Sequence, residues 1–329
     1  MTAPDAAAIA RAVQVLRAGG LVAMPTETVY GLAADAAQPA AVRAIFTAKG
    51  RPSDHPLIVH VADAAALVHW AAAVPDCAAR LAHAFWPGPL TLVLERAPAV
   101  NTVVTGGQDT IGLRCPAHPW AQALLAACAR DGVMGLAAPS ANSFGRISPT
   151  TAEHVRADLG EKPAGRIDLI LDGGPCEVGI ESTIVDCSGR APRLLRHGAI
   201  GRAQLEAVLG VPVPDAGADA PRASGRLRSH YAPRTPLELL PAAELPARVA
   251  ALGGERLAVL APAHALPDAP AQVVRRLIAP TSPGEYASRL YAALHEMDRV
   301  GADRLLVARV PDTPDWAAVA DRLERAAAH

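Results

Sequence analysis

The chain has 329 residues, of which 51% are apolar and 19% charged, and its formal net charge is −1. This composition can bury a sizeable core in one large domain or two ordinary ones, and it excludes a disordered or fibrous chain. The near-neutral charge argues against a protein that binds nucleic acid through bulk charge. Every stretch of about 18 residues is interrupted by charged residues, proline or glycine, and the N-terminus does not resemble a signal peptide. We therefore expect a cytoplasmic protein without membrane spans.

The first two thirds of the chain alternate between helical and strand-like patterns. Strands are expected over 21–25, 57–61, 90–95, 110–114, 134–138, 168–171 and 182–187, and helices over 5–16, 39–48, 118–130, 151–159 and 201–209, with two more alanine-rich helices before Trp86. This order predicts a mixed, twisted α/β sheet in a domain formed by residues 1–209.

A basic interdomain linker is predicted over 210–236, where five prolines break both periodicities and arginines outnumber acidic residues. After it, strands near 237–240, 257–260, 273–278 and 305–310 alternate with helices near 243–252, 283–299 and 314–328. Residues 237–329 are therefore expected to form a smaller Rossmann-like domain, although the absence of G-x-G-x-x-G gives dinucleotide binding no support. Five cysteines without a C-x-x-C pair predict free, buried thiols.

Polar residues gather at the ends of several predicted strands, where open α/β sheets place ligands. The first cluster is the hydroxyl-rich turn 25–32, and the second is Lys49-Gly50-Arg51 at the end of a predicted helix. A helix C-terminus favours cations in any case. The chain, however, contains 29 arginines and only two lysines, so a lysine beside an arginine indicates a compact charge next to a planar one, as in polyphosphate sites.

Arg114 lies inside an otherwise apolar predicted strand, so its guanidinium needs a carboxylate partner. The partner can come from the protein or from a ligand, and the sequence leaves both open. The small polar loop 138–143 can approach phosphate closely, although the loop taken alone is better explained as a capping turn. Together with His60 and the segments 179–184 and 194–198, these clusters predict an electrostatic binding site suited to adenylation or phosphoryl chemistry.

The motifs resemble those of the YrdC-like family. They are P-T-E-T-V-Y-G-L at 25–32, the K-x-R of Lys49 and Arg51, F-W-P-G-P-L-T-L-V-L, the S-x-N of Ser140 and Asn142, D-G-G-P-C-E-V-G-I-E-S-T-I-V-D and L-L-R-H-G-A-I. The match covers residues 5–209, and H-Y-A-P at 230–233 resembles the linker of the longer, two-domain form.

This resemblance implies an L-threonylcarbamoyladenylate synthase, which joins L-threonine, bicarbonate and ATP, with Mg²⁺ carried on the ATP phosphates. It implies that Lys49 and Arg51 are catalytic. Nucleotide contacts are implied for Lys49, Arg51, His55, Thr110, Ser140, Asn142, Ser148, Arg196, His230 and Tyr231. Threonine contacts are implied for Thr28, His60, Arg114, Ala138 and Ser182. The sequence departs from the family pattern at His55, Phe144 and Arg226.

The product of such an enzyme would serve threonylcarbamoylation of tRNA next to the anticodon, which a separate Kae-type transferase completes. Direct contact with tRNA is compatible with this role but not required by it. One alternative is an RNA-binding module of the same pathway, which the neutral charge and only eleven aromatic residues (four Trp, four Tyr, three Phe) disfavour. A carbamoyltransferase of the hydrogenase-maturation type, which shares the domain, would need acylphosphatase and zinc-binding segments that this sequence lacks.

Overall fold

The computed structural model describes residues 3–217, 219–225, 227 and 229–328, and the chain divides into two compact units. The first unit comprises residues 1–144 and 149–226, and the second comprises 145–148 and 227–329. The division at 226–227 falls inside the segment expected as a linker. Arg226, where the sequence departs from the family pattern, lies outside the described residues.

The described part of the first unit contains a nine-stranded mixed sheet in the order β7-β1-β2-β6-β3-β5-β4-β8-β9. The strands are β1 (Val22–Met24), β2 (Gly31–Asp35), β3 (Ile58–His60), β4 (Leu90–Glu95), β5 (Thr110–Arg114), β6 (Leu136–Ala137), β7 (Leu169–Ile170), β8 (Thr183–Asp186) and β9 (Arg193–Arg196). At the centre β3 runs parallel to β5, and β5 runs antiparallel to β4. Their register places His60 beside Arg114 and Arg114 beside Thr91, so polar groups from distant segments form one row across the sheet.

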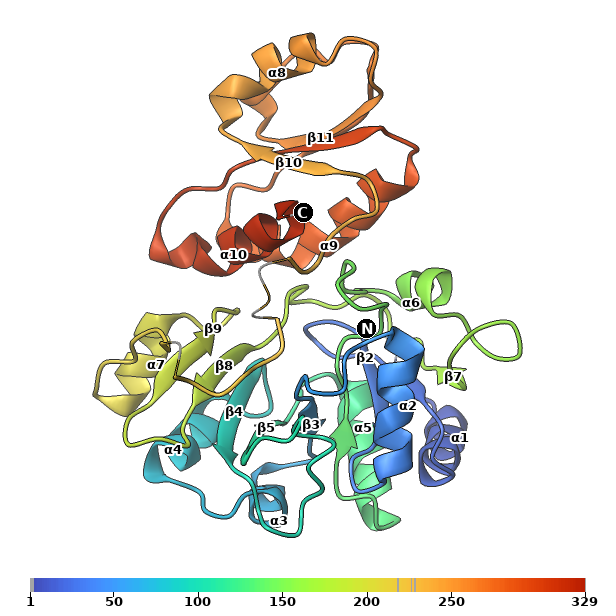
Figure 1. Cartoon of the computed structure of the whole chain (residues 1–329), viewed down its shortest axis with the longest axis vertical. Coiled ribbons are helices and arrows are strands. Elements are labelled where there is room, and N and C mark those ends of the chain that lie inside the picture. The colour runs from blue at the N-terminus through green and yellow to red at the C-terminus, as the bar shows by residue number, and fades with distance from the viewer. Residues whose placement is uncertain (1–2, 218, 226, 228, 329) are drawn as a thin grey trace. The chain divides into compact units, whose positions relative to one another are not determined.

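Helices on this sheet are fixed by local end signals. They are α1 (Ala6–Arg17), α2 (Pro39–Lys49), α3 (Leu67–Trp70), α4 (Asp76–Phe85), α5 (Pro119–Arg130), α6 (Ala152–Asp158) and α7 (Arg202–Leu209), with the 3₁₀ turn η1 (Ala64–Ala66) before α3 (Figure 1). The Asp5 carboxylate caps α1 by accepting from the Ala7 amide. Gly50 ends α2 with a φ of 63°, a left-handed conformation that glycine adopts without strain, and this turn sets Lys49 and Arg51 at the helix end.

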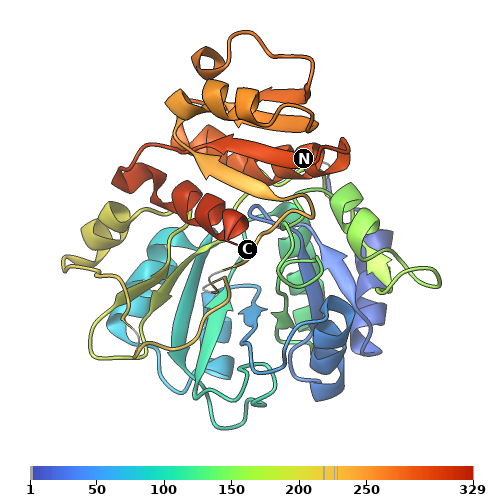
Figure 2. The ribbon, with the colours of Figure 1, turned by 45° about the horizontal axis from the view of Figure 1, so that its top comes forward.

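The second unit contains a parallel sheet in the order β10-β13-β11-β12. Its elements are β10 (Leu237–Leu240), η2 (Ala242–Glu244), α8 (Leu245–Ala251), β11 (Leu257–Ala261), η3 (Ala263–Ala265), β12 (Val273–Ile278), α9 (Pro283–Arg299), β13 (Arg304–Ala308), η4 (Pro314–Trp316) and α10 (Ala317–Ala327). Figures 1 and 2 show α8 on one face of this sheet and α9 and α10 on the other. One apolar cluster joins α8 to β11 and β13 through residues such as Leu245, Val259 and Leu306.

The expected fold class is confirmed, and so are the cysteines as free thiols, of which all but the half-buried Cys77 are buried. One strand is not among those predicted. β2 reads Gly-Leu-Ala-Ala-Asp and is buried throughout, so it shows neither alternation nor β-branched residues. β9 reads Arg-Leu-Leu-Arg, a segment for which the sequence leaves open a plain strand or part of a polar cluster, and the structure forms the strand. Within the described residues, no helix combines the length and apolarity that a membrane span requires.

Candidate active site

Lys49 is buried at the end of α2, with only 3% of its surface exposed. Its ammonium donates to the backbone oxygens of Ser140 and Asn142, both at 2.6 Å, and approaches Asn142 Oδ1 at 3.4 Å. All these acceptors are neutral. Burial, followed by the nearby charge of Arg51, lowers the pKa of Lys49 well below its usual value. Lys49 thus holds the S-x-N loop in place, and no carboxylate among the described residues forms an ion pair with its ammonium.

Arg51 and Arg196 meet at a residue of the linker. Arg51 Nη2 donates to Ser224 Oγ at 3.2 Å and to the Pro56 oxygen at 3.1 Å. Arg196 Nη1 donates to the Ser224 backbone oxygen at 2.9 Å. Ser224 Oγ in turn donates to the Pro56 oxygen at 3.0 Å. The two guanidinium groups predicted to hold phosphate are therefore engaged by one serine in this conformation.

The linker also covers the sheet beneath these arginines. Ala220 and Ala223 pack against Val93 and Ile184 of β4 and β8. A residual cavity of about 20 Å³, room for roughly one water, lies between the linker and the strands. Thr110 lines this cavity together with Ser224, so the predicted nucleotide contact at Thr110 lies under the linker.

Arg114 has an internal partner. Its Nη2 donates to Glu27 Oε1 at 2.6 Å, its Nη1 donates to Thr28 Oγ1 at 2.8 Å, and both Glu27 and Arg114 are more than 90% buried. Glu27 Oε2 also accepts from the Ala117 amide at 3.0 Å. The sequence leaves open whether the protein or a ligand supplies the carboxylate for Arg114. In the structure the protein supplies it, as Glu27. A guanidinium carries five N–H donors, so Arg114 retains donors for a ligand carboxylate.

Ser182 joins the two groups of predicted contacts. Its hydroxyl lies 2.7 Å from Thr91 Oγ1 and accepts from Arg196 Nη2 at 3.1 Å. Ala138 donates its amide to the Ile58 oxygen at 3.0 Å, which places it beside β3 and hence near His60. The same part of the sheet therefore carries four of the predicted threonine contacts, which are Thr28, His60, Arg114 and Ala138.

His55 and Phe144, both departures from the family pattern, contact one another. Their rings meet edge to face with centroids 5.4 Å apart, and the Arg51 guanidinium lies 5.6 Å from the centre of the Phe144 ring. The Phe144 amide donates to the Lys49 oxygen at 2.8 Å. Burial and the charge of Arg51 lower the pKa of His55, which favours a neutral imidazole beside the arginine.

The remaining predicted nucleotide contacts, Ser148, His230 and Tyr231, belong to the second unit. The Ser148 backbone oxygen lies 3.1 Å from His295 Nε2. Tyr231 is buried with a φ of 63°, unusual for a side chain of this size, and its ring packs against His230 and Tyr291. Their roles toward ATP stay predictions.

Two residues at this site are not singled out as site residues by the sequence. Glu27 is the only carboxylate in the hydroxyl-rich turn, which is the signal that could have paired it with the buried Arg114. Ser224 carries no such signal, because nothing in a proline- and arginine-rich segment indicates which residue meets the sheet. Among described residues, no group of three or more His, Cys, Asp or Glu side chains is arranged to hold a metal ion.

The free energy of unfolding of the protein should depend on pH through His60. Burial and then the charge of Arg114 lower its pKa to about 3. The unfolded chain binds a proton below about pH 6.5 where the folded chain does not, so stability is full above that pH and falls as pH drops toward 3. We expect urea denaturation to show about 2 kcal/mol less stability from this residue at pH 5 than at pH 7.5.

His60→Gln should remove most of this loss, whereas His69→Gln, on an exposed side chain of α3, should leave it in place. Equal pH slopes for the wild type and His60→Gln would contradict the assignment.

The comparisons with known proteins extend into both units. Residues 14–198 match the Sua5/YciO/YrdC family model, described as "Telomere recombination", and residues 200–328 match the model "Threonylcarbamoyl-AMP synthase, C-terminal domain". The threonylcarbamoyl-AMP synthase of Bacillus subtilis strain 168 is 41% identical, over 97% of this chain and 92% of that protein. That of Pyrococcus abyssi is 38% identical, over 95% of this chain and 92% of its own length.

Two solved structures agree with this. The crystal structure of P. abyssi Sua5 complexed with L-threonine has a TM-score of 0.86 and 37% identity, covering 97% of this chain and 94% of that one. A P. abyssi Sua5 variant with histidine and tyrosine replaced by alanine has a TM-score of 0.86 and 36% identity, covering 97% and 92%. The chain therefore belongs to the threonylcarbamoyl-AMP synthase family, in the two-domain form that joins a Sua5/YciO/YrdC domain to the family's C-terminal domain.

Proposed function

We propose that this protein is a threonylcarbamoyl-AMP synthase, which converts L-threonine, bicarbonate and ATP to threonylcarbamoyl-AMP, pyrophosphate and water. The observation that carries this proposal is the meeting of Lys49 with the loop of Ser140 and Asn142, next to Arg51. An enclosed ammonium that lacks a carboxylate partner is costly in the free protein, and an incoming polyphosphate would supply the missing negative charge.

The site divides into a phosphate side and a threonine side. Lys49, Arg51 and Arg196 bring positive charge to the first, with hydroxyl and amide groups beside them. On the second, Arg114 keeps free donors while Glu27 and Thr28 hold its guanidinium in one orientation. We assign the threonine carboxylate to Arg114, because a positioned guanidinium binds a carboxylate through paired hydrogen bonds.

The chemistry proceeds in two steps. The threonine amine attacks the bicarbonate carbon, which gives the N-carboxylate of threonine and releases water. A carbamate oxygen then attacks the α-phosphorus of ATP, the bond between the α- and β-phosphates breaks, and pyrophosphate leaves. The cations on the phosphate side stabilise the charge that develops on the leaving group. Mg²⁺ would be carried on the phosphates of ATP, where it would neutralise part of their charge beside the side chains of Lys49, Arg51 and Arg196.

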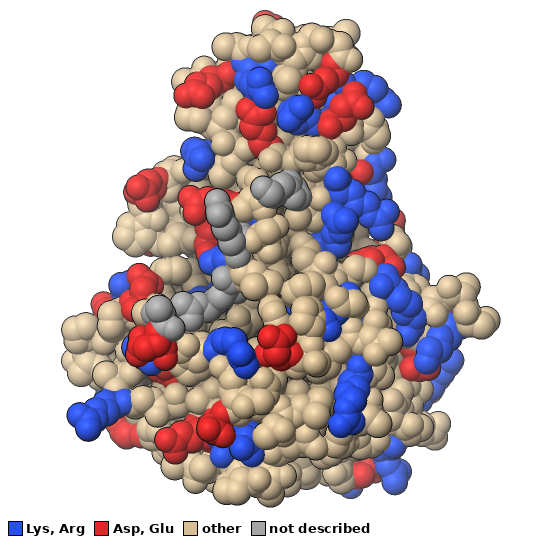
Figure 3. All heavy atoms as spheres, in the orientation of Figure 1, with Lys and Arg blue, Asp and Glu red and all other residues tan. Residues whose placement is uncertain are grey.

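The product is a mixed anhydride, which suits transfer of the threonylcarbamoyl group to an adenosine of tRNA. We propose that a separate Kae-type transferase completes this transfer. The alternative, an RNA-binding module of the same pathway, has weaker support. On the face shown in Figure 3, basic and acidic side chains are interspersed and uncharged atoms cover most of the surface.

The direct test is incubation of the purified protein with L-threonine, labelled bicarbonate and MgATP, followed by chromatography of the products. We expect label in threonylcarbamoyl-AMP and one pyrophosphate for each product molecule. Release of pyrophosphate without threonine, or no labelled nucleotide, would overturn the assignment. Filter binding of tRNA at high affinity in the absence of ATP would instead favour the RNA-binding alternative.

A further inference from the structure

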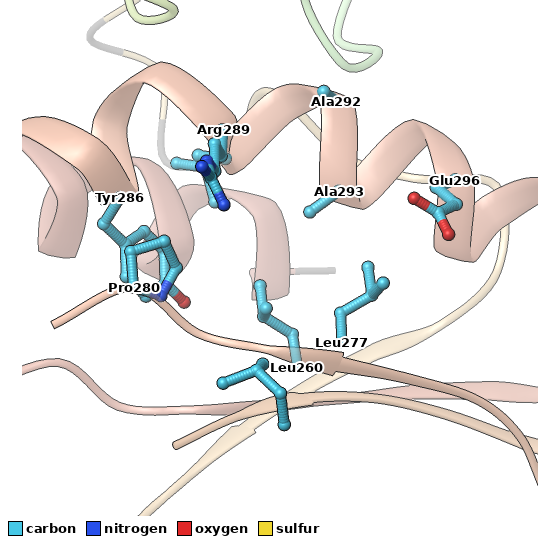
Figure 4. Close-up of a pocket in the computed structure, with 10 residues that line it drawn as sticks. Leu260, Leu277, Pro280, Tyr286, Arg289, Ala292, Ala293 and Glu296 are labelled. Atoms are coloured by element: carbon cyan, nitrogen blue, oxygen red, sulfur yellow. The ribbon is translucent and has the colours of Figure 1, made fainter. Parts of the chain in front are cut away.

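The second unit contains a half-open apolar groove of about 240 Å³ between α9 and its sheet. Figure 4 shows Leu260 of β11 and Leu277 of β12 on one side of this groove and Ala293 of α9 on the other. Nothing in the described part of the chain shows what fills the groove, so we assign it no ligand. A polar network in the first unit, next to Lys49, has a more definite role.

Asp158, the last residue of α6, holds the residue that follows the S-x-N motif. Ser143 donates its backbone N–H to Asp158 Oδ2 at 2.7 Å and its hydroxyl to Asp158 Oδ1 at 2.6 Å. Each carboxylate oxygen thus takes one donor, which fixes both the backbone and the side chain of Ser143. The Asp158 side chain is only 18% exposed, so water competes weakly for these hydrogen bonds. The loop that carries Ser140 and Asn142 is therefore anchored to α6 at its C-terminal end.

Arg166, in the loop after α6, ties the same carboxylate to the end of α2. Its Nη1 donates to the Ala48 backbone oxygen at 2.9 Å. Its Nη2 donates to Ser143 Oγ at 2.8 Å and to Asp158 Oδ1 at 3.1 Å. Ala48 immediately precedes Lys49. One guanidinium fork therefore joins the helix end to the S-x-N loop, the two segments that supply Lys49 and its partners.

A simpler interpretation is that Arg166 only caps α6. Its Nη2 also donates to the Asp158 backbone oxygen at 2.7 Å, as basic side chains near helix C-termini commonly do. This cap accounts for neither the hydrogen bond to Ala48 nor the two donors that Ser143 places on one carboxylate. The network therefore does more than end a helix, because it fixes two segments that are distant in sequence.

The same network contributes to the charge around Lys49. Burial is the largest influence and lowers the pKa of Lys49, the charges of Arg51 and Arg166 also lower it, and the charge of Asp158 raises it. A nearby carboxylate favours the ammonium form of a lysine, and a nearby guanidinium disfavours it. Asp158 thus favours the charged form of Lys49, which is the form that attracts phosphate.

We propose that Asp158 and Arg166 are positioning residues for the phosphate side of the site, where they hold the end of α2 and the S-x-N loop at the separation that lets Lys49, Ser140 and Asn142 contact one nucleotide. This inference rests on the proposed function, because it assigns the two residues to the binding of ATP. Among the described residues, neither forms a hydrogen bond with Arg114 or Glu27 on the threonine side. ATP and threonine should therefore respond differently to their replacement.

The first test measures threonylcarbamoyl-AMP synthesis with each substrate varied in turn. Asp158→Asn leaves one acceptor oxygen for the two donors of Ser143, so kcat/KM for ATP should fall about tenfold while the KM for threonine stays within about twofold. Arg166→Gln should show the same division between the substrates. Asp76→Asn is the matched control, since its carboxylate is 86% exposed and lies 3.9 Å from Arg80, and it should change neither value.

The second test follows a signal that general loosening of the fold would not produce. The chain has only two lysines, so Lys162→Arg leaves Lys49 as the single lysine in protein labelled with ¹³C-lysine. In this background Asp158→Asn should lower the pKa of Lys49, because it removes a nearby negative charge. Arg166→Gln should raise the pKa of Lys49, because it removes a nearby positive charge. Greater solvent exposure alone would move the pKa of Lys49 in the same direction in both variants.

Three results would overturn the proposal: equal rises in the KM values for ATP and threonine, kcat/KM for ATP unchanged in both variants, or Lys49 shifts of the same sign. If Asp158→Asn does not fold, Ser143→Ala removes only the hydroxyl from the network. It should raise the KM for ATP about threefold with threonine unaffected, and an unchanged KM for ATP would refute the role. Because the titration needs no turnover, a wild-type protein without synthase activity would refute the proposed function while the Lys49 shifts still decide the network.

Discussion

Replacing Lys49 with arginine should reduce kcat/KM for threonylcarbamoyl-AMP synthesis by about 10²- to 10³-fold, the usual cost of losing a positioned electrostatic group. The substitution keeps the charge and follows the chain's own preference for arginine. The pocket around Lys49 nevertheless holds a compact ammonium, with two backbone oxygens at 2.6 Å. A planar guanidinium is larger and cannot direct its donors to these converging oxygens, so the loop of Ser140 and Asn142 must move.

Lys162→Arg is the matched control. Lys162 pairs with Asp168 at 2.9 Å, and 55% of its side chain is exposed. An exposed ion pair contributes little and accepts either cation, so activity should stay within about twofold of wild type. Pyrophosphate release coupled to threonine measures both variants. If Lys49→Arg retained more than about a third of wild-type activity, the proposed role of Lys49 would fail.

The second large effect is expected at Glu27. Glu27→Gln should lower the free energy of unfolding by about 3 kcal/mol, because it leaves the buried Arg114 without its counter-ion. The carboxylate accepts from both Arg114 and the Ala117 amide, whereas a glutamine has one acceptor and would direct an N–H group at one of these donors. The KM for threonine should rise as well, because Glu27 holds Arg114 in position.

The double variant Glu27→Gln with Arg114→Met separates the two effects. It removes the uncompensated charge, so it should regain much of the stability while threonine-dependent activity stays low. Asp131→Asn is the control, since its pair with Arg17 spans 3.8 Å at the surface and should contribute less than about 1 kcal/mol. Urea denaturation measures all three variants. A loss below about 1 kcal/mol for Glu27→Gln would contradict a structural role for this pair.

Sequence patterns predict most of the fold, and the reasons for the failures are specific. Long amphipathic segments such as α1 and α9 are found because their periodicity and end signals agree. Sequence patterns do not predict β2, because a fully buried strand rich in glycine and alanine shows neither a two-residue alternation nor a high β-strand propensity. Pairing register, which brings His60, Arg114 and Thr91 into one row, depends on contacts between segments far apart in the chain.

Sequence patterns likewise predict some features of the candidate site and miss others. The scarcity of lysine applies equally to Lys49 and Lys162, and the neighbouring Arg51 is what distinguishes Lys49. The structure buries Lys49 among neutral oxygens, and its role toward ATP stays a prediction. The requirement for a carboxylate beside Arg114 is correct, but the sequence cannot choose between a ligand and Glu27, since both satisfy the same electrostatic demand. Ser224 cannot be found in this way, because where a linker rests is decided by packing rather than by local pattern.

The position of the linker on the sheet should lower the apparent affinity of the protein for nucleotide. Ser224 engages Arg51 and Arg196 in the conformation described, so a phosphate bound by these arginines competes with a tethered part of the same chain. A measured affinity then combines intrinsic binding with the fraction of molecules whose linker has lifted. A docked fraction of about 90% would weaken the apparent affinity about tenfold, and Ser224→Gly would recover part of it without adding any contact to the ligand.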